Sequence, residues 1–294
     1  MATRRMLQPT ARQVRLGSIL RGLREDGNGS QGAVCGEIGW SESKLSRIET
    51  GRLGISEDDL QFLLDRYGVK DQSLRGYVVD LRRRGNVRGW ETRVRSAVSG
   101  PYADFIGYES DAAEMYNAET MLIPGLLQTH DYAAAVIKQQ VPDMPEEERR
   151  ERLDIRDKRR EVFDRPRPLV FWGVISESVF RHVMGGPEVM AGQLEHLLSL
   201  SRDYPSTINI YVLPEESQSH GTLFGPFVIL SFPQRWEPDI VYLEGFTSTK
   251  FLEDTDQVQE YSRLFRRLMM TDSLRGPESL KLIEHYLNDY RKDV

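Results

Sequence analysis

The N-terminal part of the chain alternates apolar and polar residues with the period of short amphipathic helices. Four apolar stripes are evident: Leu16, Ile19, Leu20 and Leu23; Leu45 and Ile48; Leu60, Leu63, Leu64 and Tyr67; and Leu74, Tyr77, Val78 and Leu81. Residues three or four apart lie on one face of a helix, so each stripe can be buried against the others. A further short segment opens at Ser30 and carries Ala33, Val34 and Ile38. The pattern predicts five short helices within residues 1–84.

The segment 39–52, Gly-Trp-Ser-Glu-Ser-Lys-Leu-Ser-Arg-Ile-Glu-Thr-Gly-Arg, has the composition of a helix that meets DNA. Ser41 supplies a hydroxyl that can cap the first free backbone amides, and Gly51 provides a left-handed stop. Because Leu45 and Ile48 occupy the buried face, residues with hydrogen-bonding side chains are left on the outer face. A short helix of this kind suits the major groove of DNA.

The order of these elements resembles the helix-turn-helix of phage repressors and of the XRE family of transcription regulators, over roughly residues 10–68. The alternative, a small helical bundle without DNA, is disfavoured by the whole pattern. The resemblance implies that three side chains face base edges: Glu42, Ser43 and Arg47. It implies further contacts on or near the DNA backbone or at the helix ends: Lys44, Ser46, Arg52, Gln31 and Ser41. It also implies a structural pair between Arg24 in the first helix and Glu49.

Beyond residue 101, strand-like runs appear among the helical stretches. The sequence predicts strands at 169–174, 207–213, 227–232, 240–243 and 246–252, and helices at about 104–116, 130–140, 146–163, 177–183, 188–201, 256–270 and 277–291. Residues 85–101, with Gly and Pro around Trp90, are interpreted as a linker. We therefore expect an α+β chain: an all-α, lambda-repressor-like helix-turn-helix domain over 1–84, then a mixed α+β domain with a small sheet over 102–294.

The run 123–133, Ile-Pro-Gly-Leu-Leu-Gln-Thr-His-Asp-Tyr-Ala, is similar to a signature in the C-terminal domain of actinobacterial WhiJ-like, Scr1-type regulators. Residues 186–194 and 241–244 resemble two further blocks of that domain, so the resemblance covers nearly the whole chain. It implies a transcription regulator, a repressor or an antitoxin-like factor, with a small partner protein encoded nearby or a small-molecule effector. One helix-turn-helix domain buries little surface against DNA, so we also expect a homodimer on a pseudo-palindromic operator in double-stranded DNA.

Charge is unevenly distributed along the chain, whose net charge is −6. Residues 1–100 contain 18 Lys+Arg and 12 Asp+Glu, whereas residues 101–294 contain 21 and 33. A basic N-terminal part followed by an acidic C-terminal part is expected if only the N-terminal part contacts DNA phosphates. Two arginine groups are further candidates for phosphate contacts: Arg4 and Arg5 in an N-terminal arm, and Arg82, Arg83 and Arg84 at a helix end. Solubility of the arm explains Arg4 and Arg5 equally well. A favourable interaction with the helix dipole explains the other three arginines equally well.

No catalytic signature is present: the sequence contains no nucleophile elbow, P-loop or zinc-peptidase motif. Its five histidines are scattered, so we expect no metal, no cofactor and no enzymatic activity. The single cysteine, Cys35, excludes an internal disulfide. No apolar run is long enough to span a bilayer, and the N-terminus lacks an apolar signal core, so we expect a cytoplasmic protein without a membrane partner.

Three polar residues are candidates for a ligand site in the C-terminal domain. His220 lies in a polar loop between two predicted strands, Glu244 follows an apolar strand, and Glu177 begins a predicted helix. Loops and strand ends commonly carry binding groups, but a solvated loop or an ordinary ion pair is the alternative for each. Two other interpretations of the domain stay open, a hydrolase-like enzyme targeted to DNA and a simple dimerisation scaffold. A deep pocket where the three residues converge would favour the enzyme over the other two.

Overall fold

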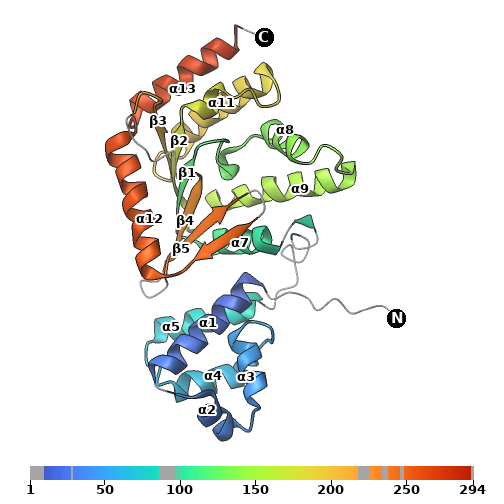
Figure 1. Cartoon of the computed structure of the whole chain (residues 1–294), viewed down its shortest axis with the longest axis vertical. Coiled ribbons are helices and arrows are strands. Elements are labelled where there is room, and N and C mark those ends of the chain that lie inside the picture. The colour runs from blue at the N-terminus through green and yellow to red at the C-terminus, as the bar shows by residue number, and fades with distance from the viewer. Residues whose placement is uncertain are drawn as a thin grey trace. The chain divides into compact units, whose positions relative to one another are not determined.

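The structure is a computed structural model that describes residues 10–27, 29–85, 94, 97–98, 100–217, 225–233, 238–245 and 248–292. Contacts divide the chain into two compact units, Met1–Tyr108 and Glu109–Val294 (Figure 1). Three predicted features lie outside the described residues: the arm with Arg4 and Arg5, most of the linker, and His220. The same holds for the side chain of Arg84. Among the described residues, no helix combines the length and apolar composition needed to cross a bilayer.

The first unit opens with the five predicted helices. They are α1 (Ala11–Asp26), α2 (Gln31–Ile38), α3 (Glu42–Glu49), α4 (Glu57–Arg66) and α5 (Gln72–Gly85). A hydroxyl caps each of the first four, from Thr10, Ser30, Ser41 and Ser56. Gly39 ends α2 in the left-handed region with φ +69°, which makes the turn between α2 and α3. The helices enclose a core in which Leu20, Leu45, Leu60 and Leu64 are fully buried.

Two glycines allow close packing between α1 and the segment that contains α3. A Cβ atom on Gly17 would lie 2.4 Å from the carbonyl oxygen of Glu49. Gly51 has φ +70°, and a Cβ atom there would lie 2.6 Å from the backbone nitrogen of Val14. Backbone atoms cannot give way as side chains do, so α1 fixes the position of α3 through direct backbone contact.

The second unit is built on a sheet. Its described strands are β1 (Glu114–Glu119), β2 (Val170–Ser176), β3 (Ile208–Leu213), β4 (Phe227–Ser231), β5 (Ile240–Glu244) and β6 (Thr249–Leu252). They form a six-stranded sheet in the order β3-β2-β1-β4-β5-β6. β1, β2 and β3 are parallel, whereas β4 pairs antiparallel with both β1 and β5, and β6 pairs antiparallel with β5. The chain therefore has the predicted fold class, with a mixed α+β domain after the helix-turn-helix.

Helices cover both faces of this sheet. After α7 (Gly100–Asp111) they are α8 (His130–Gln140), α9 (Glu146–Arg159), α10 (Ser178–Arg181), α11 (Pro187–Asp203), α12 (Thr255–Arg267) and α13 (Pro277–Tyr290). α12 packs on the face that carries Ala118, Val174 and Phe227. Figure 1 shows α8 and α9 on the opposite side of the sheet from α12. Phe163, in the short helix η2 (Arg160–Phe163), contacts Phe171 on that second face.

The central strand was not predicted. The sequence predicts a helix through residue 116, but α7 ends at Asp111 and β1 begins at Glu114, so the prediction is wrong for the last residues. Strand β1 reads Glu-Met-Tyr-Asn-Ala-Glu, which offers neither an apolar run nor a clean alternation. Its polar residues are tolerated because the strand is enclosed by neighbours on both sides, a tertiary effect that overrides local preference.

Candidate functional site

The recognition helix α3 presents the side chains that the sequence assigns to DNA. The Ser41 hydroxyl accepts a hydrogen bond from Lys44 N at 3.2 Å, so the helix begins where its cap predicts. Leu45 and Ile48 are buried. The other side of the helix and its end carry the candidate contacts: Glu42, Ser43, Arg47 and Arg52 are exposed, and Lys44 and Ser46 are half-buried. The arrangement is that of a helix-turn-helix with a polar outer face.

A buried ion pair sets the orientation of α3. Arg24 donates from Nε to Glu49 Oε1 at 2.6 Å and from Nη2 to Glu49 Oε2 at 3.0 Å. The hydrogen bonds to Glu49 raise the pKa of Arg24. Gln31 adds a third donor, since its Nε2 lies 2.8 Å from Glu49 Oε2. The predicted DNA contact of Gln31 therefore has one amide hydrogen and the carbonyl oxygen left to use.

Two cationic side chains on α3 are partly engaged within the protein. Lys44 Nζ lies 3.6 Å from the centre of the Trp40 ring and 3.8 Å from Asp59 Oδ2. Its predicted phosphate contact thus competes with a cation–π contact and an ion pair. Arg47 makes one long hydrogen bond, from Nε to Ser43 O at 3.3 Å, and stays exposed. Arg47 is the more available of the two for a base edge.

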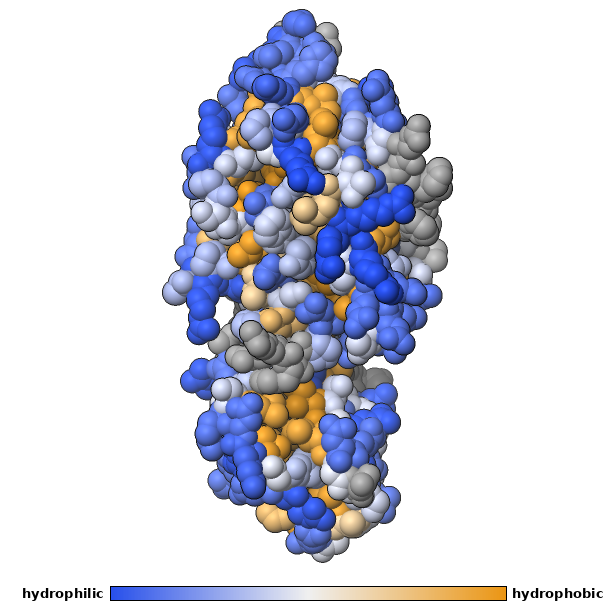
Figure 2. Space-filling view, turned by 90° about the vertical axis from the view of Figure 1, so that its left-hand side faces the viewer, coloured by the Kyte–Doolittle hydropathy of each residue, from blue (hydrophilic) through white to orange (hydrophobic). Residues whose placement is uncertain are grey.

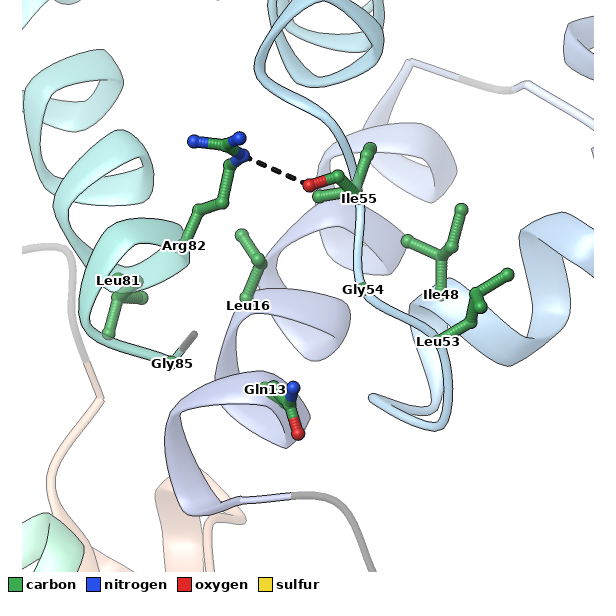
Figure 3. Close-up of a pocket in the computed structure, with 9 residues that line it drawn as sticks. All are labelled: Gln13, Leu16, Ile48, Leu53, Gly54, Ile55, Leu81, Arg82 and Gly85. Carbon is green, nitrogen blue, oxygen red and sulfur yellow. Dashed lines mark hydrogen bonds between the residues drawn. The ribbon is translucent and has the colours of Figure 1, made fainter. Parts of the chain in front are cut away.

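A hollow opens between α1, the loop after α3 and the end of α5 (Figure 3). Its lining is mostly apolar and comprises Gln13, Leu16, Ile48, Leu53, Gly54, Ile55, Leu81, Arg82 and Gly85. Arg82 donates from Nε to Ile55 O at 2.9 Å and from Nη1 to Glu57 Oε2 at 3.2 Å. The hollow has room for about one water molecule, so it is a packing feature rather than a ligand site. Arg82 holds α5 to the loop, and Arg83 pairs with Asp80.

Apolar side chains gather on another surface of the first unit. Figure 2 shows a contiguous apolar patch in the region of α1 and α5. Half-buried apolar residues on these helices include Ile19, Leu23, Leu74 and Val79. Patches of this kind commonly mark contacts with another protein.

In the second unit, the signature segment 123–133 is held by buried amide groups. Gln128, which is 5% exposed, donates from Nε2 to the carbonyl oxygen at the start of the segment at 2.7 Å. Gln193 on α11 is fully buried and forms hydrogen bonds with two backbone groups. Its Oε1 accepts from Thr129 N at 2.7 Å, and its Nε2 donates to Leu127 O at 2.8 Å. These bonds satisfy backbone groups at both ends of the short helix η1 (Gly125–Leu127), which precedes α8. The signature therefore has a structural role.

Glu177 has a structural role as well. It follows β2 and accepts hydrogen bonds from Tyr286 Oη at 2.6 Å, Arg181 Nη2 at 3.1 Å and Glu215 N at 3.0 Å. Burial acts to raise the pKa of Glu177, but these bonds outweigh it and the pKa is lowered. Glu244 ends β5, and two strands separate β5 from β2 in the sheet. Their backbones are thus about 14 Å apart, so Glu177 and Glu244 do not converge.

Glu244 instead lies near Glu119 on β1, and Asn117 is on the same face of β1 two residues before Glu119. The sequence analysis selected neither Glu119 nor Asn117. Glu119 is half-buried. Burial, and then the charge of Glu244, raise the pKa of Glu119 to about 8, while hydrogen bonding from Asn117 acts in the opposite direction. Asn117 is 3% exposed, and its Oδ1 has no hydrogen-bond partner among the described residues. Polar residues two apart in a central strand would have been the signal, had the strand been recognised.

Two family models match separate stretches of the chain. Residues 15–76 match the family model described as a helix-turn-helix domain. Residues 102–285 match the model of a domain of unknown function, DUF5753. No curated protein and no solved structure matches the chain. The first match, with the geometry of α2 and α3, supports a DNA-binding protein that regulates transcription. Because the second match spans more than half of the chain, the protein belongs to the DUF5753 family.

Proposed function

We propose that this protein is a transcriptional repressor, WhiJ-like and antitoxin-like, that reads an operator with α3 and is modulated through its second unit. The observation that carries the proposal is the exposed polar face of α3, anchored from behind by the Arg24–Glu49 pair. Glu42, Ser43 and Arg47 read base edges, and Lys44, Ser46 and Arg52 meet phosphates. An anchored helix keeps these side chains in register with the groove, which base readout requires.

The test is loss of discrimination. Operators are first recovered by genome-wide pull-down of bound DNA, and affinities for one operator and for random DNA are then measured at fixed salt. Arg47→Ala should remove about 1–3 kcal/mol of discrimination, which is roughly a ten- to hundredfold loss on the operator. Arg202→Ala is a matched control, because Arg202 on α11 also donates to the carbonyl oxygen four residues earlier, at 3.2 Å. If Arg47→Ala loses affinity equally for operator and random DNA, Arg47 does not read a base edge.

The proposed state on DNA is a homodimer whose contacts lie in residues 102–294. The apolar patch on α1 and α5 offers a competing location within the first unit (Figure 2). Sedimentation of the full chain and of a 1–84 fragment, with its helicity checked by circular dichroism, separates the two. A monomeric fragment with weak operator binding supports the second unit as the dimer interface. A dimeric fragment with full affinity would place that interface on the patch instead.

The second unit is proposed to bind an effector, either a small molecule or a small partner protein, and no reaction is assigned to it. A pure scaffold gains nothing from the buried Oδ1 of Asn117, which has no donor among the described residues, or from the nearby carboxylates Glu119 and Glu244. The coupling free energy between an effector site and a DNA-binding site is typically about 1–3 kcal/mol, and it acts equally in both directions. Operator DNA should therefore change effector affinity by the same factor. Binding that is indifferent to operator would leave the domain as a scaffold.

A further inference from the structure

Three polar side chains lie on one face of the sheet where β1 and β5 end. β4 lies between these strands and pairs with both, and Asn117 on β1 and Tyr242 on β5 are both opposite Val228. Glu119 and Glu244 are each two residues further along, so they lie on the same face as Asn117, on either side of β4. The backbones of β1 and β5 are about 10 Å apart, and two glutamate side chains that lean toward each other can span most of this distance.

The described residues leave this group without a positive partner. No cationic group is among the influences on the pKa of Glu119, and neither Glu119 nor Glu244 forms an ion pair with a described residue. Two phenols also lie in this region. Tyr242 is on the same face of β5, two residues before Glu244, and Tyr132 is on α8. The charge of Glu119 acts to raise the pKa of Tyr132 after the larger effect of burial. Two carboxylates that share a half-buried site repel each other, which is one reason that Glu119 holds its proton. A cation placed between them would remove that repulsion.

Asn117 gives an independent indication that something binds here. Its side chain lies beside the Glu119 carboxylate, to which it contributes a hydrogen bond. Its Oδ1 is buried and lacks a donor among the described residues. A buried acceptor without a donor is destabilising, and such groups in native proteins usually have a partner. An N–H group from a ligand would supply that donor.

We propose that Asn117, Glu119 and Glu244, together the acceptor cluster, bind the protonated amine or guanidinium group of a small organic cation. All three side chains offer oxygen acceptors, which match the N–H donors of such a group. Glu244 is exposed whereas Asn117 is buried, so a slim group can approach both residues more readily than a protein surface can.

The proposal deepens the proposed effector role of the second unit, because it gives the chemistry of the effector. It rests on that role only for the consequence on DNA. Cation binding itself is measured without DNA, and the reading of DNA by Arg47 is measured without cation. Failure of one experiment therefore leaves the other interpretable.

The test is calorimetric titration of the full chain with butylamine and butylguanidine. Neutral 1-pentanol and magnesium chloride are the comparison probes. Both organic cations should bind saturably, with higher affinity at pH 8.5 than at pH 6.5, because Glu119 must lose its proton. Titration at pH 7 in two buffers of different ionisation enthalpy should reveal release of about one proton. Equal binding of 1-pentanol, saturable binding of magnesium alone, or no saturable binding of either cation would overturn the proposal.

Variants connect the binding to these residues. Glu119→Gln and Glu244→Gln should each weaken binding of both cations at least tenfold, because each removes a charge-assisted hydrogen bond. Glu253→Gln is the matched control, since Glu253 is an exposed carboxyl in the connection between β6 and α12. It should leave the affinity unchanged. If Glu119→Gln and Glu253→Gln bind the cations equally well, the acceptor cluster is not their site.

Discussion

Arg24 and Glu49 are 25 residues apart in sequence and form a two-bond ion pair in which both side chains are almost completely buried. The pair joins α1 to the end of α3, and Gln31 extends it to α2. Buried pairs are costly to desolvate, so the pair fixes one arrangement of the helices more than it adds net stability. The outer face of α3 is positioned by this contact from the inside.

Breaking the pair should therefore destabilise the first unit strongly. Arg24→Met leaves the Glu49 carboxylate buried and uncompensated, which should lower the free energy of unfolding by about 3–5 kcal/mol. The double variant Arg24→Met/Glu49→Met should recover most of that loss. Urea unfolding with hydrogen exchange of residues 10–85 measures both. Arg21→Met is the control, because Arg21 and Glu25 form an exposed pair. A similar small loss for Arg21→Met and Arg24→Met would contradict the account.

The contact between α1 and α3 gives a second prediction. In Gly17→Ala the new methyl group would meet the Ile48 and Glu49 carbonyl oxygens at 2.6 and 2.4 Å, so α1 must move away from α3. We expect a loss of about 1–3 kcal/mol of stability and weaker operator binding. Gly22→Ala on the same helix has nothing within 4 Å and should instead stabilise by up to about 1 kcal/mol. Thermal unfolding and anisotropy titrations compare the two; opposite signs are expected.

The engagement of Lys44 within the protein gives a third prediction. Asp59→Asn removes its ion-pair partner and a charge that repels phosphate, so affinity for all DNA sequences should rise a few-fold. Lys44→Ala should reduce the slope of log affinity against log salt by about 1. Asp58→Asn is the control, since Asp58 is an exposed neighbour in the same first turn of α4. Equal gains from Asp58→Asn and Asp59→Asn would indicate a general charge effect, without release of Lys44.

The N-terminal unit could be predicted because its signals are local. Ser41 as a cap, Leu45 and Ile48 three apart, and Gly39 as a left-handed turn all lie within a dozen residues, and each acts on its own neighbours. The resemblance then identified Arg24 and Glu49, whose contact depends on the packing of α1 against α3.

The acceptor cluster could not be predicted in the same way. Glu119 and Glu244 meet only because β4 inserts between β1 and β5, and strand order is a property of the whole sheet. β1 itself carries too few apolar residues to be recognised as a strand. Glu177 illustrates the same limit, because its strongest partner, Tyr286, is 109 residues away on α13. As a carboxylate at the start of a predicted helix, Glu177 is a plausible ligand-binding residue. Its hydrogen-bond partners, which are distant in sequence, give it a structural role instead.

The last prediction concerns the pH dependence of stability. Burial raises the pKa of Glu119 to about 8, from an ordinary value of 4.5. Between these values the unfolded chain has lost the proton and the folded protein keeps it, so the free energy of unfolding falls as pH rises and levels off above pH 8. Glu119→Gln lacks this proton. Its advantage over the native chain should be absent at pH 4, grow from pH 5 and exceed about 1 kcal/mol at pH 8, because one pKa unit corresponds to about 1.4 kcal/mol. Urea unfolding of both chains from pH 4 to 9 measures the difference. Glu253→Gln should parallel the native chain throughout, and a Glu119→Gln curve that does so as well would show that Glu119 ionises freely in the folded protein.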